Sequence, residues 1–204
     1  MDAFTTLTAI AAPYEPINVD TDRIIPARFL KYPRSGGYGQ FLFHDIRRQG
    51  EAQDPSFVLN RAPYDQARIF VANTNFACGS SREGAVFAFF DTGFRAVIAP
   101  SFGDIFFNNC MKNGVVPARL PDAVCAGLRS ALAAQPGAQI TVDLVHQVVV
   151  GPDAAAHPFT IDGFFRELLL KGTDELGFTL GLLGDISAFE TRHLETMPWL
   201  GRSG

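Results

Sequence analysis

Short apolar runs alternate with amphipathic segments through the middle of this chain. Three runs of four or five residues predict buried strands over residues 68–72, 96–99 and 115–118. Pro117, in the last run, is typical of an edge strand or a strand end. The segments between and after these runs carry apolar residues at helical spacing and predict helices over residues 80–93, 102–113 and 121–134.

The flanking parts of the chain are less regular. Residues 12–66 are rich in proline, glycine and aromatic residues and predict no long element. Residues 139–150 predict two strands joined near Leu144-Val145, and the C-terminal part predicts helices over residues 164–171 and from 186 to about 194. The alternation indicates an α/β fold with mixed, partly parallel strands and flanking helices, in one compact domain without a linker.

Composition narrows the class of protein. The 204 residues are 47% apolar and 19% charged, which favours a globular core over disorder. A formal net charge of −4 without a basic run argues against nucleic-acid binding. We see no apolar run long enough to cross a membrane and no signal peptide at the start, so we expect a cytoplasmic protein with no membrane role.

Cysteine, histidine and phenylalanine usage adds two expectations. Cys78, Cys110 and Cys125 are far apart, and the four histidines show no metal-ligand spacing, so we expect reduced thiols and no metal or iron–sulfur site within this chain. The 19 phenylalanines indicate either a core packed with phenylalanine or an apolar face that needs a partner.

The candidate chemistry lies in residues 75–83, Asn-Phe-Ala-Cys-Gly-Ser-Ser-Arg-Glu, between a predicted strand and a predicted helix. A helix that starts near Ser80 or Ser81 turns its first amides outward, where they attract an anion. Two hydroxyls and the guanidinium of Arg82 lie at the same helix start, and an arginine binds a carboxylate through two parallel hydrogen bonds. This indicates a site for a small acid. The spacing Ser80-x-x-Glu83 is also that of a capping box, which needs no ligand.

A second polar segment is residues 18–26, Asn-Val-Asp-Thr-Asp-Arg-Ile-Ile-Pro. Taken singly, its Asx and Thr side chains favour a role in shaping a turn. Together with residues 75–83 and residues 98–106 (Ile-Ala-Pro-Ser-Phe-Gly-Asp-Ile-Phe), it resembles the small subunits of 3-isopropylmalate dehydratase, the swivel-domain partners in the aconitase superfamily. The resemblance extends from about residue 15 to residue 195.

The resemblance implies a single swivelling domain of β/β/α type over residues 1–204, with a C-terminal helical tail. It also implies a hydro-lyase that isomerises 3-isopropylmalate and 2-isopropylmalate, in leucine biosynthesis, by dehydration and rehydration. The chain would act only with a large subunit that holds a [4Fe–4S] cluster, in a heterodimer or higher assembly, and would itself hold no cofactor. Its substrate would be a small dicarboxylic hydroxy acid.

The same resemblance assigns roles to residues. Ser80 would be the base that takes the carbon-bound proton, and Ser81 and Arg82 would bind substrate carboxylates. Arg34 follows Asp22 by twelve residues, where related aconitases place an arginine for a distal carboxylate; a solvated surface arginine is the alternative. Residues 29–39, which include three glycines, would form a mobile loop that distinguishes substrate side groups and becomes ordered with substrate and the large subunit.

Four positions depart from the family pattern: Ala77 replaces a glycine, Gly84 replaces a histidine, and Val86-Phe87 replaces Pro-Trp. Ala77 suggests a backbone that accepts a side chain, and Gly84 weakens the first helical turn. Because the two serines and the arginine are intact, we expect the chemistry to be retained. The departures leave open a paralogous dehydratase subunit for 2-methylmalate or 2,3-dimethylmalate, a module that binds a small acid without chemistry, and a partner that only docks another chain.

Overall fold

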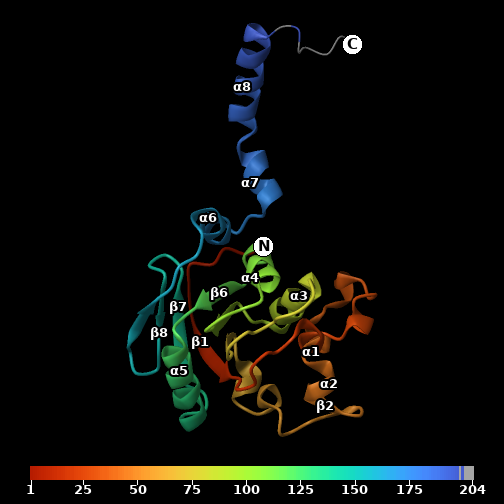
Figure 1. The fold of residues 1–204 in the computed structure, drawn as a ribbon, viewed down its shortest axis with the longest axis vertical. Coiled ribbons are helices and arrows are strands. Elements are labelled where there is room, and N and C mark those ends of the chain that lie inside the picture. The colour runs from red at the N-terminus through yellow and green to blue at the C-terminus, as the bar shows by residue number, and fades with distance from the viewer. Residues whose placement is uncertain (198, 200–204) are drawn as a thin grey trace.

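The computed structural model describes residues 1–197 and residue 199, and its centre is a seven-stranded sheet (Figure 1). The strand order is β6-β5-β4-β1-β7-β8-β9. The first four strands in this order are parallel, and β1, β7, β8 and β9 pair antiparallel. The strands are β1 (Thr6–Pro13), β4 (Ile69–Val71), β5 (Ala96–Ala99), β6 (Val116–Arg119), β7 (Gln139–Asp143), β8 (Val148–Val150) and β9 (Ala156–Pro158).

The apolar runs are strands, as predicted. Strands β4, β5 and β6 confirm the three runs, and β6 is the edge strand that Pro117 indicated. The pair β7–β8 confirms the two strands expected in residues 139–150. Strand β1 lies at the centre of the sheet, between β4 and β7, although its sequence has little strand signal; Ala11 and Ala12 are fully buried there but carry small side chains. The irregular region adds a two-stranded hairpin of β2 (Arg48–Gln49) and β3 (Ala52–Gln53).

Helices cover both faces of the sheet. Phe70 and Val97 face the core under α3, whereas Ile69 and Ile98 face the core under α5, because side chains alternate along each strand. Helix α3 ends where Gly93 adopts a left-handed conformation, as the sequence indicated. The helices are α1 (Thr21–Ile24), α2 (His44–Arg47), α3 (Glu83–Thr92), α4 (Asp104–Lys112), α5 (Asp122–Ala134), α6 (Gly163–Lys171), α7 (Glu175–Gly181) and α8 (Leu183–Thr196).

Phenylalanine packs the core on the α3 face. The rings of Phe70 and Phe89 lie 5.2 Å apart in an edge-to-face arrangement, and Phe43 stacks on Phe70 at 5.7 Å. Phe76 and Phe106 extend the same cluster. Each of these rings is at most 2% exposed, so the phenylalanines form the core that the composition indicated, and their edge-to-face contacts stabilise it beyond the area they bury.

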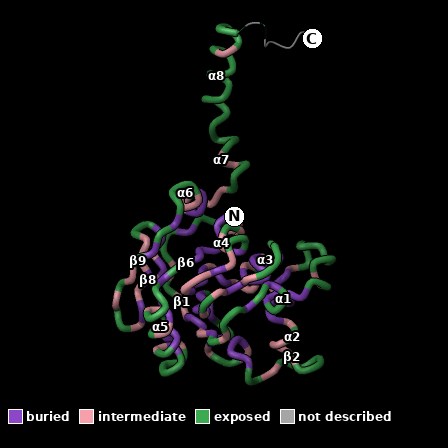
Figure 2. Tube along the Cα trace, viewed as in Figure 1, coloured by how far each residue is buried: buried purple, intermediate pink, exposed green. Residues whose placement is uncertain are grey.

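The C-terminal helices leave the body of the domain. Helix α6 packs on it through Leu168 and Leu169, but α7 and α8 project away from the sheet (Figure 1), and no residue of either helix is buried (Figure 2). Helix α8 contains the helix predicted near residues 186–194 and is longer at both ends, whereas α7 was not predicted. Residues 198 and 200–204 of the expected tail lie outside the described residues. Among the helices of the described part, none combines the length and the hydropathy that crossing a bilayer requires.

Candidate active site

Three chain segments meet at the carboxyl edge of the parallel strands. Residues 18–26 follow β1, residues 75–83 follow β4, and residues 98–106 include the end of β5. In open α/β sheets this edge is where ligands usually bind. The sheet order places β1, β4 and β5 side by side, so the three polar segments, far apart in sequence, become neighbours.

The first two segments pair like short parallel strands. The Cys78 amide donates to the Val19 carbonyl at 3.0 Å, and the Thr21 amide donates to the Cys78 carbonyl at 3.0 Å. The Thr21 hydroxyl, on a side chain from a residue only 3% exposed, donates to the carbonyl of Ser80 at 2.9 Å. The backbone that carries Ser80 is therefore held by residues almost sixty positions earlier in the chain.

The third segment closes the arrangement from the other side. The Ser101 hydroxyl accepts a hydrogen bond from the Asn75 amide at 2.8 Å, and the Ser101 carbonyl accepts one from the Phe76 amide at 3.0 Å. The Gly103 amide donates to the Phe76 carbonyl at 2.9 Å. A Cβ on Gly103 would lie 2.4 Å from the Ala77 carbonyl oxygen, so only glycine fits there. The motif segments thus form one hydrogen-bonded unit.

The backbone of residues 75–79 turns sharply. Asn75, Ala77 and Gly79 have φ angles of +57°, +56° and +99°, all in the left-handed region. The expectation that Ala77 marks a backbone suited to a side chain is therefore wrong: the alanine occupies a conformation that favours glycine. Such strain persists only where surrounding contacts hold it, and it often accompanies functional sites.

Helix α3 begins later than predicted. Its first residue is Glu83, and Arg82 at the N-cap position is extended and makes no side-chain capping bond. The capping box between Ser80 and Glu83 is therefore absent, and the capping interpretation of Ser80 is not supported. The residues Ser80 and Ser81 are exposed ahead of the helix, and their hydroxyls have no hydrogen-bond partner among the described residues. At the start of α3 the Ala85 amide donates to the Arg82 carbonyl at 3.0 Å, whereas the amides of Glu83 and Gly84 have no acceptor among the described residues.

Arg82 is held in place by a residue that sequence reasoning missed. Its side chain is 13% exposed; Nη2 donates to Asp22 Oδ2 at 2.6 Å, and Nη1 pairs with Asp22 Oδ1 and donates to the Ile25 carbonyl at 3.4 Å. The hydrogen bond from Arg82 lowers the pKa of Asp22, and the same bond raises the pKa of Arg82. The Nε–H and the outer Nη2–H have no acceptor in the described part of the chain, so one edge of the guanidinium remains for a carboxylate.

The sequence does mark Asp22 as a candidate, because this residue lies in the motif of residues 18–26, which also contains Asp20. Asp20 caps α1 by accepting a hydrogen bond from the Arg23 amide at 2.7 Å, which is the turn-shaping role expected of an Asx side chain. Asp22 accepts a hydrogen bond from the Ala27 amide at 3.2 Å and also contacts an arginine sixty residues later. Sequence spacing alone does not distinguish these two roles.

The loop of residues 29–39 lies along α3, and parts of it are tied down. The Tyr38 amide donates to Asp91 Oδ2 at 2.8 Å, and the Tyr38 hydroxyl donates to the Tyr32 carbonyl at 2.8 Å. A Cβ on Gly39 would lie 2.9 Å from the Asp91 backbone. These contacts attach the C-terminal end of the loop, which the sequence predicted to be mobile, to α3. Arg34 is exposed, and its guanidinium lies over the ring of Phe87.

Gly84 makes room for that loop. A Cβ at Gly84 would lie 2.6 Å from Leu30 Cδ2 and 3.3 Å from Tyr38 Cε1. The glycine is buried in the first turn of α3, and Leu30 is 38% exposed above it. The departure from the family histidine therefore lets the loop approach the helix start closely, in addition to its cost in helix propensity.

The three cysteines are buried or half-buried. Burial raises the pKa of the Cys110 thiol well above its usual value and that of Cys125 to about 11, so neither favours the thiolate form that metals bind. Cys78 is half-buried beside Asp20. No group of three metal-ligating side chains occurs among the described residues.

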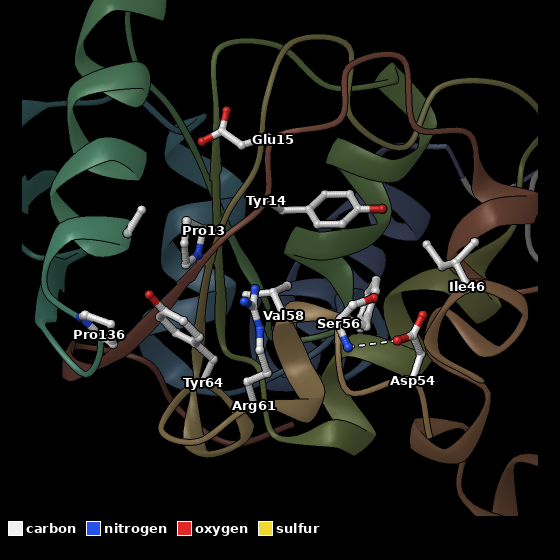
Figure 3. A pocket seen from close by; sticks show the side chains of 12 residues that line it. Pro13, Tyr14, Glu15, Ile46, Asp54, Ser56, Val58, Arg61, Tyr64 and Pro136 are labelled. Carbon is white, nitrogen blue, oxygen red and sulfur yellow. Dashed lines mark hydrogen bonds between the residues drawn. The ribbon is translucent and has the colours of Figure 1, made fainter. Parts of the chain in front are cut away.

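A cavity of about 440 Å³ lies away from these residues, and Figure 3 shows side chains that line it. Tyr14, Tyr64 and Arg61 line it, and burial raises the pKa of Tyr14. Its lining includes the carboxylates of Glu15 and Asp54 and none of the residues predicted to bind substrate.

The fold and the site together define the class of this protein. The start of α3, two hydroxyls without a partner among the described residues and an arginine paired with Asp22 lie at the carboxyl edge of a partly parallel sheet. The family model described as "Aconitase C-terminal domain" matches residues 1–123. The chain is a swivel domain of the aconitase type.

Comparison with known proteins narrows this further. The model described as "LeuD_N" matches residues 126–163, and a model for the C-terminal domain of the 3-isopropylmalate dehydratase small subunit matches residues 177–203. The 3-isopropylmalate dehydratase small subunit of Granulibacter bethesdensis is 51% identical over 99% of this chain and 97% of the relative, and that of Gluconacetobacter diazotrophicus is 50% identical over 99% and 98%. A crystal structure of 3-isopropylmalate dehydratase from Methanocaldococcus jannaschii aligns with a TM-score of 0.62 at 25% identity, covering 92% of this chain and 99% of that one. The chain belongs to the 3-isopropylmalate dehydratase small-subunit family.

Proposed function

We propose that this chain is the small subunit of a two-chain hydro-lyase that interconverts 2-isopropylmalate and 3-isopropylmalate in leucine biosynthesis. The observation that carries the proposal is the convergence of the three motif segments on Ser80, whose hydroxyl faces solvent without a structural partner, next to Arg82. Relatives about 50% identical over nearly the whole chain carry the name of this enzyme's small subunit.

Ser80 is the proposed base. A serine hydroxyl is a very weak acid in water, so it serves as an alkoxide only where the site stabilises negative charge strongly. The first amides of α3 and the guanidinium of Arg82 supply positive potential at the same place. Ser81 and the open edge of Arg82 are placed to bind a substrate carboxylate, while Asp22 keeps the guanidinium plane in position.

The loop of residues 29–39 is the proposed contact for the rest of the substrate. Leu30 presents an apolar side chain directly above the first turn of α3, which suits the alkyl group of a substituted malate. Arg34 is the proposed ligand of the distal carboxylate. We further propose that the exposed turn at Gly36 and Gly37, where an added Cβ would meet nothing within 4 Å, moves as the loop closes over substrate.

The site needs a second chain. Ser80 and Ser81 lie on an open surface, and no group of three metal-ligating side chains comes together in the described part of the chain. We infer a large subunit that holds a [4Fe–4S] cluster and covers the site, in the cytoplasm. When bound, that cluster supplies a Lewis acid for the departing hydroxyl and a carboxylate. The residues of this chain then hold the carboxylates, move the carbon-bound proton at Ser80 Oγ and help to exclude water.

Reconstitution tests the proposal. We expect no turnover from this chain alone, and turnover of 3-isopropylmalate when it is co-expressed anaerobically with the large subunit. A panel that adds 2-methylmalate and 2,3-dimethylmalate separates the paralogous assignments, because the substrate with the highest kcat/KM identifies the enzyme. Activity of the isolated chain, or no activity on any substituted malate in a complex with an intact cluster, would refute the proposal.

A further inference from the structure

Arg34 is held by an aromatic ring. Its guanidinium carbon lies 3.7 Å from the centroid of the Phe87 ring, the shortest of the cation–ring contacts in the described part of the chain. Among the described residues, no carboxylate or carbonyl accepts a hydrogen bond from Arg34. The neighbouring Arg28 differs, because it lies over Phe29 and is also paired with Asp45.

Stacking leaves the guanidinium chemically available. The five N–H donors of arginine lie in the plane of the group and point outward, whereas an aromatic ring contacts its flat face. A ring therefore fixes the plane without using a donor, in contrast to Asp22, which occupies one edge of Arg82. Both bidentate edges of Arg34 remain available for a carboxylate.

The ring is itself well placed. Phe87 follows Arg82 by five residues, which is about 7.5 Å along the axis of α3, so Arg34 is held beside the same helix that carries the site. Phe87 is half-buried, and Tyr38 meets it edge-to-face at 5.9 Å. Because the Tyr38 amide is bonded to Asp91, the segment that follows Arg34 is attached to α3 as well.

We propose that Phe87 is a positioning residue that holds Arg34 with its donor edges free to bind one substrate carboxylate while Arg82 binds the other. This inference rests on the proposed function for its substrate. It assigns a purpose to Phe87 at a position where the sequence departs from the family's tryptophan: phenylalanine retains the aromatic face that the contact uses.

Kinetics of the assembled enzyme tests the proposal. From the strength of an exposed cation–π contact, we expect Phe87→Leu to raise KM for the substituted malate about two- to five-fold with kcat little changed. Phe87→Trp, which keeps an aromatic face, should have the KM of the original enzyme. Phe90→Leu is the matched control, because Phe90 is a half-buried residue of the same helix and lies under a different guanidinium, that of Arg95. It should leave KM unchanged. In an Arg34→Gln background, Phe87→Leu should have no further effect, because its partner is gone.

A second measurement does not depend on activity. In the full-length free chain labelled with ¹⁵N, the Arg34 Nε–H signal, assigned by its loss in Arg34→Gln, should shift in Phe87→Leu and stay in place in Phe90→Leu. Added D-malate should move that signal more weakly in Phe87→Leu than in the original chain. If the assembled enzyme turned over no substituted malate, the proposed function would fail, and this measurement would still decide the role of Phe87. The inference would be overturned if the effects of Arg34→Gln and Phe87→Leu on KM were additive in the double variant, or if the Arg34 Nε–H signal did not shift in Phe87→Leu.

Discussion

Ser80→Ala separates a catalytic serine from a structural one. The Ser80 hydroxyl has no hydrogen-bond partner among the described residues, and Arg82, not Ser80, occupies the N-cap of α3. Removing the hydroxyl should therefore change the free energy of unfolding by less than about 0.5 kcal/mol, as at a typical surface site. A true N-cap serine would cost about 1 kcal/mol. Loss of the base should lower kcat of the assembled enzyme by a factor of about 10²–10⁴ or more.

Ser101→Ala is the reciprocal control. The Ser101 hydroxyl accepts a hydrogen bond from the Asn75 amide at 2.8 Å in a part-buried position, so its loss should cost about 1 kcal/mol. For a chain of this length, that corresponds to a fall in melting temperature of about 2–4 °C, against at most about 1–2 °C for Ser80→Ala. Ser101→Ala should retain most of its turnover once folded, because its hydroxyl holds the loop and takes no part in the reaction.

The assay pairs thermal unfolding of the free chain with initial rates of the complex. We expect the two variants to behave in opposite ways. Ser80→Ala should lose turnover and keep its melting temperature, whereas Ser101→Ala should lose melting temperature and keep its turnover. A fall clearly above about 2 °C for Ser80→Ala, matching that of Ser101→Ala, would restore the capping interpretation. Retention of most of the turnover by Ser80→Ala would show that another group is the base.

Four further outcomes are expected. Arg82→Lys should raise KM, because lysine keeps the charge but loses the planar fork, and unaltered kinetics would contradict carboxylate binding at this residue. Because the pKa of Asp22 is lowered in the folded chain, its pair with Arg82 should stabilise the fold above about pH 4 and lose that contribution as the pH falls further. The Asp22 side chain is 58% exposed, so the loss is at most about 1 kcal/mol. Urea unfolding of the original chain and of Asp22→Asn at pH 7 and pH 3 measures this difference. Arg129→Leu should lower the free energy of unfolding by about 1–3 kcal/mol in the same assay, because its 5%-exposed guanidinium donates to the Ala72 carbonyl at 3.0 Å. Glu15→Gln, which changes the exposed partner of Arg129, should lower it less. Gly84→Ala should leave the melting temperature within about 2 °C, because the gain in helix propensity offsets the cost of displacing Leu30 above it. The same variant should change the ratio of kcat/KM among substituted malates.

The sequence alone determined the features that depend on local patterns. Strands β4 and β5 follow from continuous apolar runs, and the end of α3 follows from Gly93, because burial and left-handed glycine leave a signature within a few residues. The three motif segments were also recognisable, since each keeps its residue types in a short stretch. These features pointed correctly to the fold class and the family.

Tertiary structure decided how those segments meet. Helix α3 starts at Glu83 and not at Ser80 because residues 76–80 pair with residues 19–21 and 101–103, which keeps this stretch out of a helical conformation. That pairing exposes the serine hydroxyls that a capping box would have occupied. No local pattern near Ser80 indicates it, because the partners come from other parts of the chain.

The same reason explains the arginines. Asp22 reaches Arg82 across sixty residues, and Phe87 supports Arg34 across fifty-three, so neither contact has a period or a spacing that a sequence displays. Strand β1 likewise occupies the centre of the sheet although its Ala11 and Ala12 give little apolar signal, because burial there depends on β4 and β7 on either side. Residue type made these side chains candidates; the strand order, which brings distant segments to one edge of the sheet, decided which of them act together.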